Sequence, residues 1–407
     1  MMPAPLLRAL RRVSHGPCHL VGGAVRDALL GRPVQDWDVT VPDGAAELAR
    51  RFARETGGSW FELDAERGYS RVCLAQGSVD FAPWRAATLE GDLRGRDFTV
   101  NALALPLHET EDDGLLDPLG GLADLRRRVL RCCSERSFAD DPLRILRGVR
   151  LALQFQLEAE PKTLRLMRRD VPLLRQSAGE RIVAELEKIL GQERDPLALL
   201  RESGCCEYLF GSLPEGFTLP EISKKVHALE MLARKDSWTS AAAFRLAALA
   251  LADGGVWRQL PWSGRMRRLL ADLIATPIDL LKQYEALRCS ERGRALWLER
   301  LGRNFRERLL FAALLSKADE APLPGIFANY ERCAVSGRVP PLVTAETLGS
   351  LTGLSGPELG RALRAVEQAE IDGLLHDRRE AVDWLAAFGK GIDREPGPDY
   401  ILSHTRE

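Results

Sequence analysis

Residues 19–27 read HLVGGAVRD and residues 35–41 read QDWDVTV, and these two segments decide the fold. A short apolar run enters a Gly-Gly turn, and a helical segment leads away from it. Asp36 and Asp38 then stand one residue apart in an apolar strand. Residues i and i+2 of a strand point to the same face, so the two carboxylates lie side by side. The pattern predicts a strand, turn, helix and strand that present two acidic groups together.

Two carboxylates at this distance repel each other, and a divalent cation removes the conflict. Mg²⁺ usually takes one or two carboxylates together with phosphate oxygens and water. Gly22 and Gly23 leave backbone N–H groups open to a phosphate. Taken singly, the acidic pair is also typical of a solvated strand edge and the glycines of an ordinary turn. Their close spacing favours a site for a nucleotide and magnesium.

The composition is that of an ordinary globular protein, with 407 residues, 45% hydrophobic, 28% charged and a net charge of −1. This length predicts roughly two to four domains. Arginine far outnumbers lysine, which suits local contacts with phosphate or bases. None of the eight cysteines has Cys-x-x-Cys spacing, so we expect reduced thiols and no zinc site. No apolar run approaches a membrane span, and we expect a cytoplasmic protein without a membrane partner.

The first third of the chain alternates helix and strand signals, including a hairpin at residues 76–77, which predicts an α+β arrangement. Beyond residue 134 the strand signals vanish and helical periodicity dominates. We predict strands at 18–22, 34–41, 69–75 and 78–82, and helices at 6–13, 24–30 and 44–56.

Further polar side chains offer two interpretations each. Asp80 lies in an apolar strand and is either a third carboxylate or an edge residue facing water. Arg96 and Asp97 precede an apolar helical run, where they contact a nucleotide or simply start the helix. Asp141 and Arg144 stand at i and i+3 on one predicted helix face, either as a surface ion pair or as paired groups that read a base edge.

An arginine-rich region near residue 300 is either a solvated helix face or a track for a phosphate backbone. It comprises Arg292, Arg294, Arg300, Arg303, Arg306 and Arg308.

Several of these segments stand in the order typical of one family. The chain resembles the class II tRNA nucleotidyltransferases and bacterial poly(A) polymerases of the polymerase β superfamily. The resemblance covers nearly the whole chain and rests on GGAVRD at 22–27 with the acidic pair, RDFTVNA at 96–102, DPLGG at 117–121, DDPLR at 140–144, ERIVAEL at 180–186 and LSGPELG at 354–360.

The resemblance implies a polymerase-β-like head with a mixed or antiparallel sheet, followed by an all-α neck, body and tail. The head spans 1–134, the neck with nucleotide-selecting helices 135–195, the body 196–330 and the tRNA-binding tail 331–407.

It also implies the chemistry. Asp36 and Asp38 would bind two Mg²⁺ ions, which would activate the 3′-hydroxyl of tRNA for attack on a nucleoside triphosphate. From its place in the strand, Asp80 is our candidate for a third catalytic carboxylate. Asp97 would contact the ribose, and Arg181 would support the helix whose Asp141 and Arg144 pair with the base of CTP or ATP. The implied nucleotide-binding residues are Gly22, Gly23, Arg26, Arg96, Asp97, Asn101, Asp141, Arg144 and Arg147.

Three departures from the family pattern stand out. Gly95 occupies the place of the family's first arginine, and Asp140 that of a glutamate. The flexible loop after Arg85 is shortened to residues 86–91. In the family this shortening marks CC-adding enzymes, which stop after two cytidines and need a separate A-adding enzyme. We therefore expect CC addition, with complete CCA addition, A addition or poly(A) synthesis as alternatives.

Overall fold

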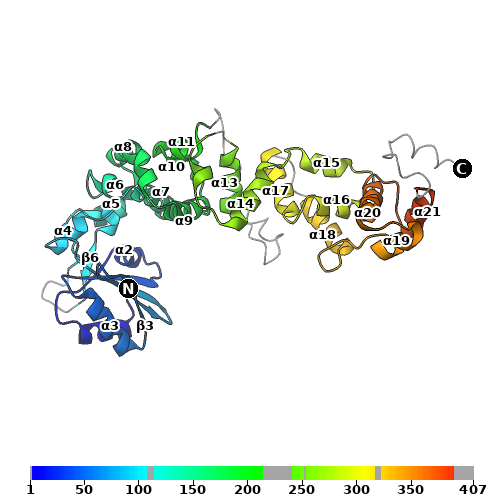
Figure 1. The fold of residues 1–407 in the computed structure, drawn as a ribbon. Coiled ribbons are helices and arrows are strands. Elements are labelled where there is room, and N and C mark those ends of the chain that lie inside the picture. Colours follow the sequence, from blue (N-terminus) through cyan, green and yellow to red (C-terminus); the bar gives the residue numbers. More distant parts are fainter. Residues whose placement is uncertain (1, 108–113, 214–240, 252–253, 317–321, 389–407) are drawn as a thin grey trace. The chain divides into compact units, whose positions relative to one another are not determined.

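The computed structural model describes residues 2–107, 114–213, 241–251, 254–316 and 322–388 (Figure 1). The chain forms two compact units, one made of Met1–Leu219 with Ala248–Ser263 and the other of Pro220–Ala247 with Gly264–Glu407. A mixed sheet occupies the N-terminal part and helices follow it, which confirms the α+β prediction. Within the described residues, no helix combines the length and the apolar character needed to cross a membrane.

Six strands form one sheet in the order β3-β4-β5-β2-β1-β6. Only β2 and β5 run parallel, and the other neighbours are antiparallel. The two edge strands β3 and β6 were not predicted, because one lacks a burial alternation and the other is very short. The strands are β1 (His19–Val21), β2 (Asp36–Val41), β3 (Ser59–Asp64), β4 (Tyr69–Leu74), β5 (Gly77–Pro83) and β6 (Ala104–Pro106).

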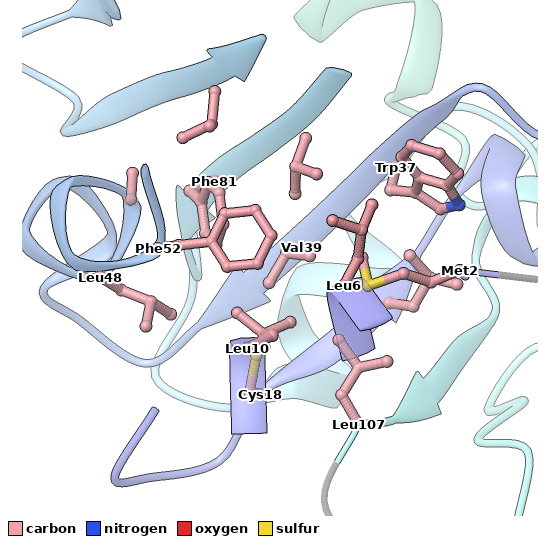
Figure 2. Close-up of a cluster of buried hydrophobic side chains, with 14 of the residues drawn as sticks. Met2, Leu6, Leu10, Cys18, Trp37, Val39, Leu48, Phe52, Phe81 and Leu107 are labelled. Carbon is pink, nitrogen blue, oxygen red and sulfur yellow. The ribbon is translucent and has the colours of Figure 1, made fainter. Parts of the chain in front are cut away.

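One face of this sheet carries the hydrophobic core, which Figure 2 shows against helices α1 (Ala4–Val13) and α3 (Ala45–Thr56). Trp37 and Val39 are fully buried there, and the rings of Phe52 and Phe81 lie 5.5 Å apart. Burying each such side chain contributes about 1.5–3 kcal/mol. Since strand residues alternate, the core residues Trp37 and Val39 direct their neighbours to the opposite face.

The rest of the first unit covers the end of the sheet with short helices and then a helical region. Strands β7 and β8 pair in parallel, which corrects the prediction that no strand follows residue 134. Each of these two strands has only two residues, which are too few to show an alternating pattern in the sequence. The elements are α2 (Gly23–Leu29), α4 (Leu89–Arg94), η1 (Thr99–Asn101), α5 (Gly121–Arg127), β7 (Val129–Leu130), α6 (Ser137–Asp140), α7 (Arg144–Phe155), β8 (Glu158–Ala159), α8 (Pro161–Asp170), η2 (Val171–Gln176), α9 (Gly179–Leu190), α10 (Leu197–Glu202), α11 (Cys205–Phe210) and η3 (Trp257–Gln259).

Helix α7 packs directly on the segment that follows α4. A Cβ atom on Gly148 would lie 2.6 Å from Phe98 Cζ and 2.5 Å from Met167 Cε, so a larger residue there would have to displace both side chains. On its other side, Arg150 pairs with Glu185 of α9 at 2.7 Å. These contacts fix the N-terminal turn of α7 beside the open face of the sheet.

The described part of the second unit is helical. Arg292 pairs with the buried Glu370 at 2.6 Å, and Arg306 pairs with Glu331 at 2.9 Å. These two arginines therefore hold helices together, and the track for a phosphate backbone stays a prediction. The remaining helices are α13 (Ala241–Ala250), α14 (Gly264–Ile274), α15 (Leu280–Ala286), α16 (Glu291–Arg300), α17 (Phe305–Ser316), α18 (Leu323–Cys333), α19 (Ala345–Thr352), α20 (Gly356–Ile371) and α21 (Arg378–Phe388).

Candidate active site

The open face of the sheet carries a group of carboxylates. Asp36 and Asp38 share this face of β2, and the parallel register sets them beside Ser78 and Asp80 of β5. Ser78 Oγ donates to Asp36 Oδ1 at 2.7 Å. The side-by-side placement expected from the Asp-x-Asp spacing is therefore present, with Asp80 next to Asp38 on the adjacent strand.

Asp80 is already engaged by an arginine. Arg71, its direct partner on β4, donates from Nε and Nη2 to the two carboxylate oxygens at 2.6 and 2.7 Å. This hydrogen bonding raises the pKa of Arg71, and the guanidinium stays charged. The role of Asp80 as a third catalytic carboxylate remains a prediction.

The donor chemistry of Asp36 and Asp38 fits Mg²⁺. Among the described residues, no group of three or more acidic, histidine or cysteine side chains gathers closely enough to hold a metal ion. Magnesium does not require such a cage, because it commonly takes one or two carboxylates and completes its shell with substrate phosphates and water.

Asp38 lies in a crowded electrostatic environment. Its side chain contacts solvent on the open face, while protein surrounds it on its other sides. This burial raises the pKa of Asp38, the Arg96 guanidinium opposes the shift, and the charge of Asp80 adds to it. A cation bound here would favour the ionised form.

The Gly-Gly turn makes room for Asp38 and Arg96. Gly22 has φ of 72°, and a Cβ atom there would lie 3.0 Å from Arg96 Nη1 and 3.3 Å from Asp38 Oδ2. A side chain at position 22 would therefore push the Arg96 guanidinium away from the Asp38 carboxylate. Gly23 follows as the first residue of α2.

A buried polar network supports the floor of the site. Arg26 donates from Nη1 to Asn101 Oδ1 and from Nε to Asp27 at 2.9 Å. Asn101 in turn donates to Asp97 Oδ1 at 3.1 Å, and Arg147 lies 2.9 Å from Asp97 Oδ2. Arg26 is buried and occupied by protein groups, so its predicted contact with a phosphate stays a prediction.

Asp97 is ionised despite its burial. Burial alone raises the pKa of this carboxyl, but the charge of Arg147 and hydrogen bonds from Asn101 and the Phe98 N–H outweigh it, and the pKa is lowered. The carboxylate is therefore a charged acceptor at the cavity described next. Both of its oxygens already have protein partners, so its predicted contact with the ribose stays a prediction.

A cavity of about 920 Å³ lies between the sheet region and the helices that follow it. This is within the range of small-molecule sites. Six arginines and three aspartates line it, which suits a triphosphate. The lining includes the predicted residues Arg96, Asp97, Asp141, Arg144 and Arg147, and also Arg85.

Arg144 and Asp141 meet at this cavity, although not as predicted. Helix α7 begins at Arg144, and Asp141 precedes it with an extended backbone, so the expectation of one shared helix face is wrong. Arg144 donates to the carbonyls of Gly95 at 2.9 Å and Arg96 at 3.2 Å. Asp141 pairs with Arg181 at 3.4 Å, in keeping with the implied support from Arg181. Pro142 stops the helix from extending back, since proline lacks an N–H and restricts the preceding residue.

The short loop was expected at residues 86–91. In the structure, the link between β5 and α4 spans residues 84–88, and residues 89–91 already belong to α4. Thr88 caps α4 by accepting from the Gly91 N–H at 3.1 Å. The buried Asp92 accepts from the Arg85 N–H at 3.1 Å and pairs with Arg96 at 3.3 Å. The link is therefore closed by hydrogen bonds at both ends.

The sequence patterns did not single out Arg71 or Arg85 as residues of the site. The hairpin at 76–77 contained the signal for Arg71, because its register sets Arg71 opposite Asp80. Arg85 gave no comparable signal, since its position depends on the turn that Asp92 closes.

Two protein-family models match parts of the chain. The family model described as the poly A polymerase head domain matches residues 18–88 and 77–131. A second, described as a probable RNA and SrmB-binding site of polymerase A, matches residues 156–217.

The relatives carry related names. A CC-adding tRNA nucleotidyltransferase of Geobacter sulfurreducens is 49% identical over 46% of this chain and 44% of its own length. One of Synechocystis is 31% identical over 91% of this chain and 93% of its own length. Other relatives are named A-adding or multifunctional CCA proteins. The Thermotoga maritima CCA-adding enzyme complexed with tRNA has a similar fold, with TM-score 0.69 and 24% identity over 95% of this chain and 96% of that one.

Proposed function

Because this chain belongs to the class II tRNA nucleotidyltransferase family, we propose that it adds two cytidines from CTP to the 3′ end of tRNA. The observation that carries the proposal is the arginine-rich cavity beside the open carboxylate face, with Arg96 adjoining both. Nucleotide selection and phosphoryl chemistry thus have neighbouring sites.

Asp36 and Asp38 hold magnesium in this proposal. Bound there, Mg²⁺ supplies the positive charge that acidifies the RNA 3′-hydroxyl and neutralises the triphosphate. The 3′-oxygen bonds to the α-phosphorus, the bond to pyrophosphate breaks, and the hydroxyl proton leaves to solvent. The protein groups position the reactants and stabilise charge.

The cavity residues then orient the nucleotide. Arg96 and Arg147 contact the triphosphate, since guanidinium groups match phosphate oxygens. The ionised Asp97 accepts a hydrogen bond from the ribose. Arg144 offers paired donors and Asp141 paired acceptors to the edge of the base.

The closed link between β5 and α4 favours CC addition over CCA addition. Asp92 binds both the Arg85 N–H and Arg96, and these contacts hold the two ends of the segment in place. A pocket that must accept CTP first and ATP later needs an element that moves. A separate A-adding enzyme would then complete the tRNA end in the cytoplasm.

Nucleotide incorporation tests the specificity. The full chain is incubated with a tRNA lacking its CCA end and with labelled CTP, labelled ATP or both. We expect two cytidines and no adenosine. Adenosine after two cytidines would instead establish a complete CCA-adding enzyme, and many adenosines on generic RNA would establish a poly(A) polymerase.

The variant Asp38→Asn tests the metal assignment. We expect cytidine incorporation to fall by about 10³-fold or more, because a bound metal contributes several kcal/mol to the transition state. Mg²⁺ binding measured by calorimetry should weaken in parallel. Ser78→Ala, which removes only a hydrogen bond to Asp36, is the matched control and should cost a few-fold. Full activity of Asp38→Asn would refute the assignment.

A further inference from the structure

We propose that the open face of β3 and β4 is a platform for the single-stranded nucleotides that precede the reacting 3′ end of the RNA, with Phe61 stacking on one base. This inference rests on the proposed function, because it assigns a subsite to the same RNA substrate.

Strand register connects the platform to the carboxylates in one row. Phe61 of β3 is directly opposite Arg71 of β4, Arg71 is opposite Asp80 of β5, and Asp80 is opposite Asp38 of β2. Directly paired strand residues project from the same face. Phe61 therefore stands at the end of a row that begins at the proposed metal ligands.

The orientation of β3 supports this placement. Trp60 turns to the core side, where the guanidinium carbon of Arg50 lies 4.5 Å from its ring. Its neighbour Phe61 must then face the open side, and it is 52% exposed. Leu63, on the same strand, is equally exposed. Phe61 and Leu63 therefore present apolar surface to solvent on this strand, and the Phe61 ring has room for a stacked base.

The groups beside Phe61 suit nucleic acid. Arg71 is held by Asp80 through Nε and Nη2, so its Nη1 is not used by that carboxylate and can donate to a phosphate. Tyr69 lies on the same strand face as Arg71 and also lines the nucleotide cavity. An aromatic ring interleaved with guanidinium groups is the usual composition of a single-strand binding surface.

The dimensions fit the last nucleotides of a strand. Three strand spacings separate Phe61 from Asp38, which is about 14 Å. A few stacked nucleotides at ~3.4 Å each span this distance. The platform would thus hold the strand shortly before its reacting end.

A second copy of the chain fits the same surface less well. An edge strand can pair with another edge, but β3 has a register irregularity between Glu62 and Asp64. Such a bulge twists an edge strand and disrupts regular pairing. The Arg71 guanidinium directly beside Phe61 further favours RNA over an apolar protein surface.

The test compares Phe61→Val with Phe61→Trp in the full chain. Valine keeps a good strand former but removes the ring, and tryptophan keeps a stacking surface. Glu62→Ala, on the same strand but the opposite face, is the matched control. We measure kcat and the KM values for CTP and for an RNA hairpin lacking its CCA end, together with fluorescence of 2-aminopurine placed at each of its terminal positions.

Phe61→Val should raise the KM for RNA by about fivefold to a hundredfold, the range expected for one lost base–aromatic stack. The kcat and the KM for CTP should change less than twofold, and quenching of one 2-aminopurine position should disappear. Phe61→Trp should retain both properties, and Glu62→Ala should behave as the parent.

An unchanged KM for RNA in Phe61→Val would overturn the platform while leaving cytidine transfer intact. A parent protein that transfers no cytidine would instead refute the proposed function. RNA-free dimers that dissociate in Phe61→Val, seen by sedimentation velocity, would assign the face to a second copy and also overturn the inference.

Discussion

Arg144 combines two tasks at the scale of a single residue. Its guanidinium lines the cavity and at the same time donates to the carbonyls of Gly95 and Arg96. The backbone contacts hold its plane in one orientation, and a planar donor group in a fixed orientation can distinguish base edges. Lysine at this position would keep the positive charge, but its ammonium group is not planar.

We therefore expect Arg144→Lys to raise the KM for CTP by about tenfold or more and to reduce discrimination between CTP and ATP. Incorporation kinetics with each nucleotide check this. Arg136→Lys is the control, because Arg136 is highly exposed and only pairs loosely with Asp140. Unchanged selectivity in Arg144→Lys would show that the base is chosen elsewhere.

The ionised Asp97 makes the stability of the fold depend on pH. Its pKa is lowered in the folded state, so it stabilises the fold above the unfolded value of about 3.9 and loses this effect as the pH falls through the folded value. We expect Asp97→Asn to lower stability at pH 7 by about 1–2 kcal/mol, a discounted value because Arg147 is partly exposed.

Thermal melts of the parent and Asp97→Asn at several pH values measure this effect. The difference in melting temperature between the parent and Asp97→Asn should be constant from pH 7 to about pH 5 and should narrow below pH 4. A gap that widened on acidification would mean that Asp97 is protonated in the folded protein at neutral pH.

The Gly-Gly turn shows how one short element serves the site. Gly22 and Gly31 both have positive φ, at 72° and 67°, but only Gly22 has close neighbours. Alanine at either position meets backbone strain, because residues with a side chain rarely adopt a positive φ, and this strain costs about 1–3 kcal/mol. We expect Gly22→Ala alone to reduce activity, by about tenfold or more, because its Cβ would displace Arg96 or Asp38.

Melting temperatures and cytidine incorporation separate the two effects. Both variants should lose stability, whereas Gly31→Ala should retain the parent's activity per folded molecule. Equal activity losses in the two variants would assign the effect of Gly22 to backbone strain rather than to the crowding of the site.

Local patterns predicted those elements whose residues carry their own signal. The strand around Asp36 and the helix over 45–56 follow from alternation and from helical period, and the structure has both. Strand β3 was not predicted, because the residues of this edge strand, Phe61 among them, do not alternate between buried and exposed. The family resemblance supplied the site residues.

Such local patterns cannot predict contacts between residues that are far apart in the sequence. The pairing of Arg71 with Asp80 depends on hairpin register, and that of Arg144 with the Gly95 carbonyl depends on how α7 packs. The error at Asp141 has the same origin, since the local i, i+3 spacing assumed a helix that starts only after Pro142.

At the scale of the whole molecule, the two compact units should unfold separately. Every residue proposed to contact the nucleotide lies in the unit that contains the sheet. Ligand binding stabilises only the folded unit that binds it, by about 2.7 kcal/mol at a concentration of 100 times Kd.

Differential scanning calorimetry should therefore show two transitions, and CTP with Mg²⁺ should raise one of them by about 5 °C or more. The Asp38→Asn variant, with its weakened metal site, should show a smaller shift. One shared transition, or an equal shift of both, would show that the units unfold as one cooperative body.

The division of the chain also has a consequence for its biosynthesis. The sheet-containing unit is closed by Ala248–Ser263, where Gly255 packs so tightly against the Leu209 carbonyl that a Cβ atom would lie 2.1 Å from it. A ribosome delivers residues from the N-terminus onward, so this segment emerges only after residues 220–247 of the other unit. The sheet-containing unit can therefore complete its packing only after residues 220–247 of the other unit have been translated.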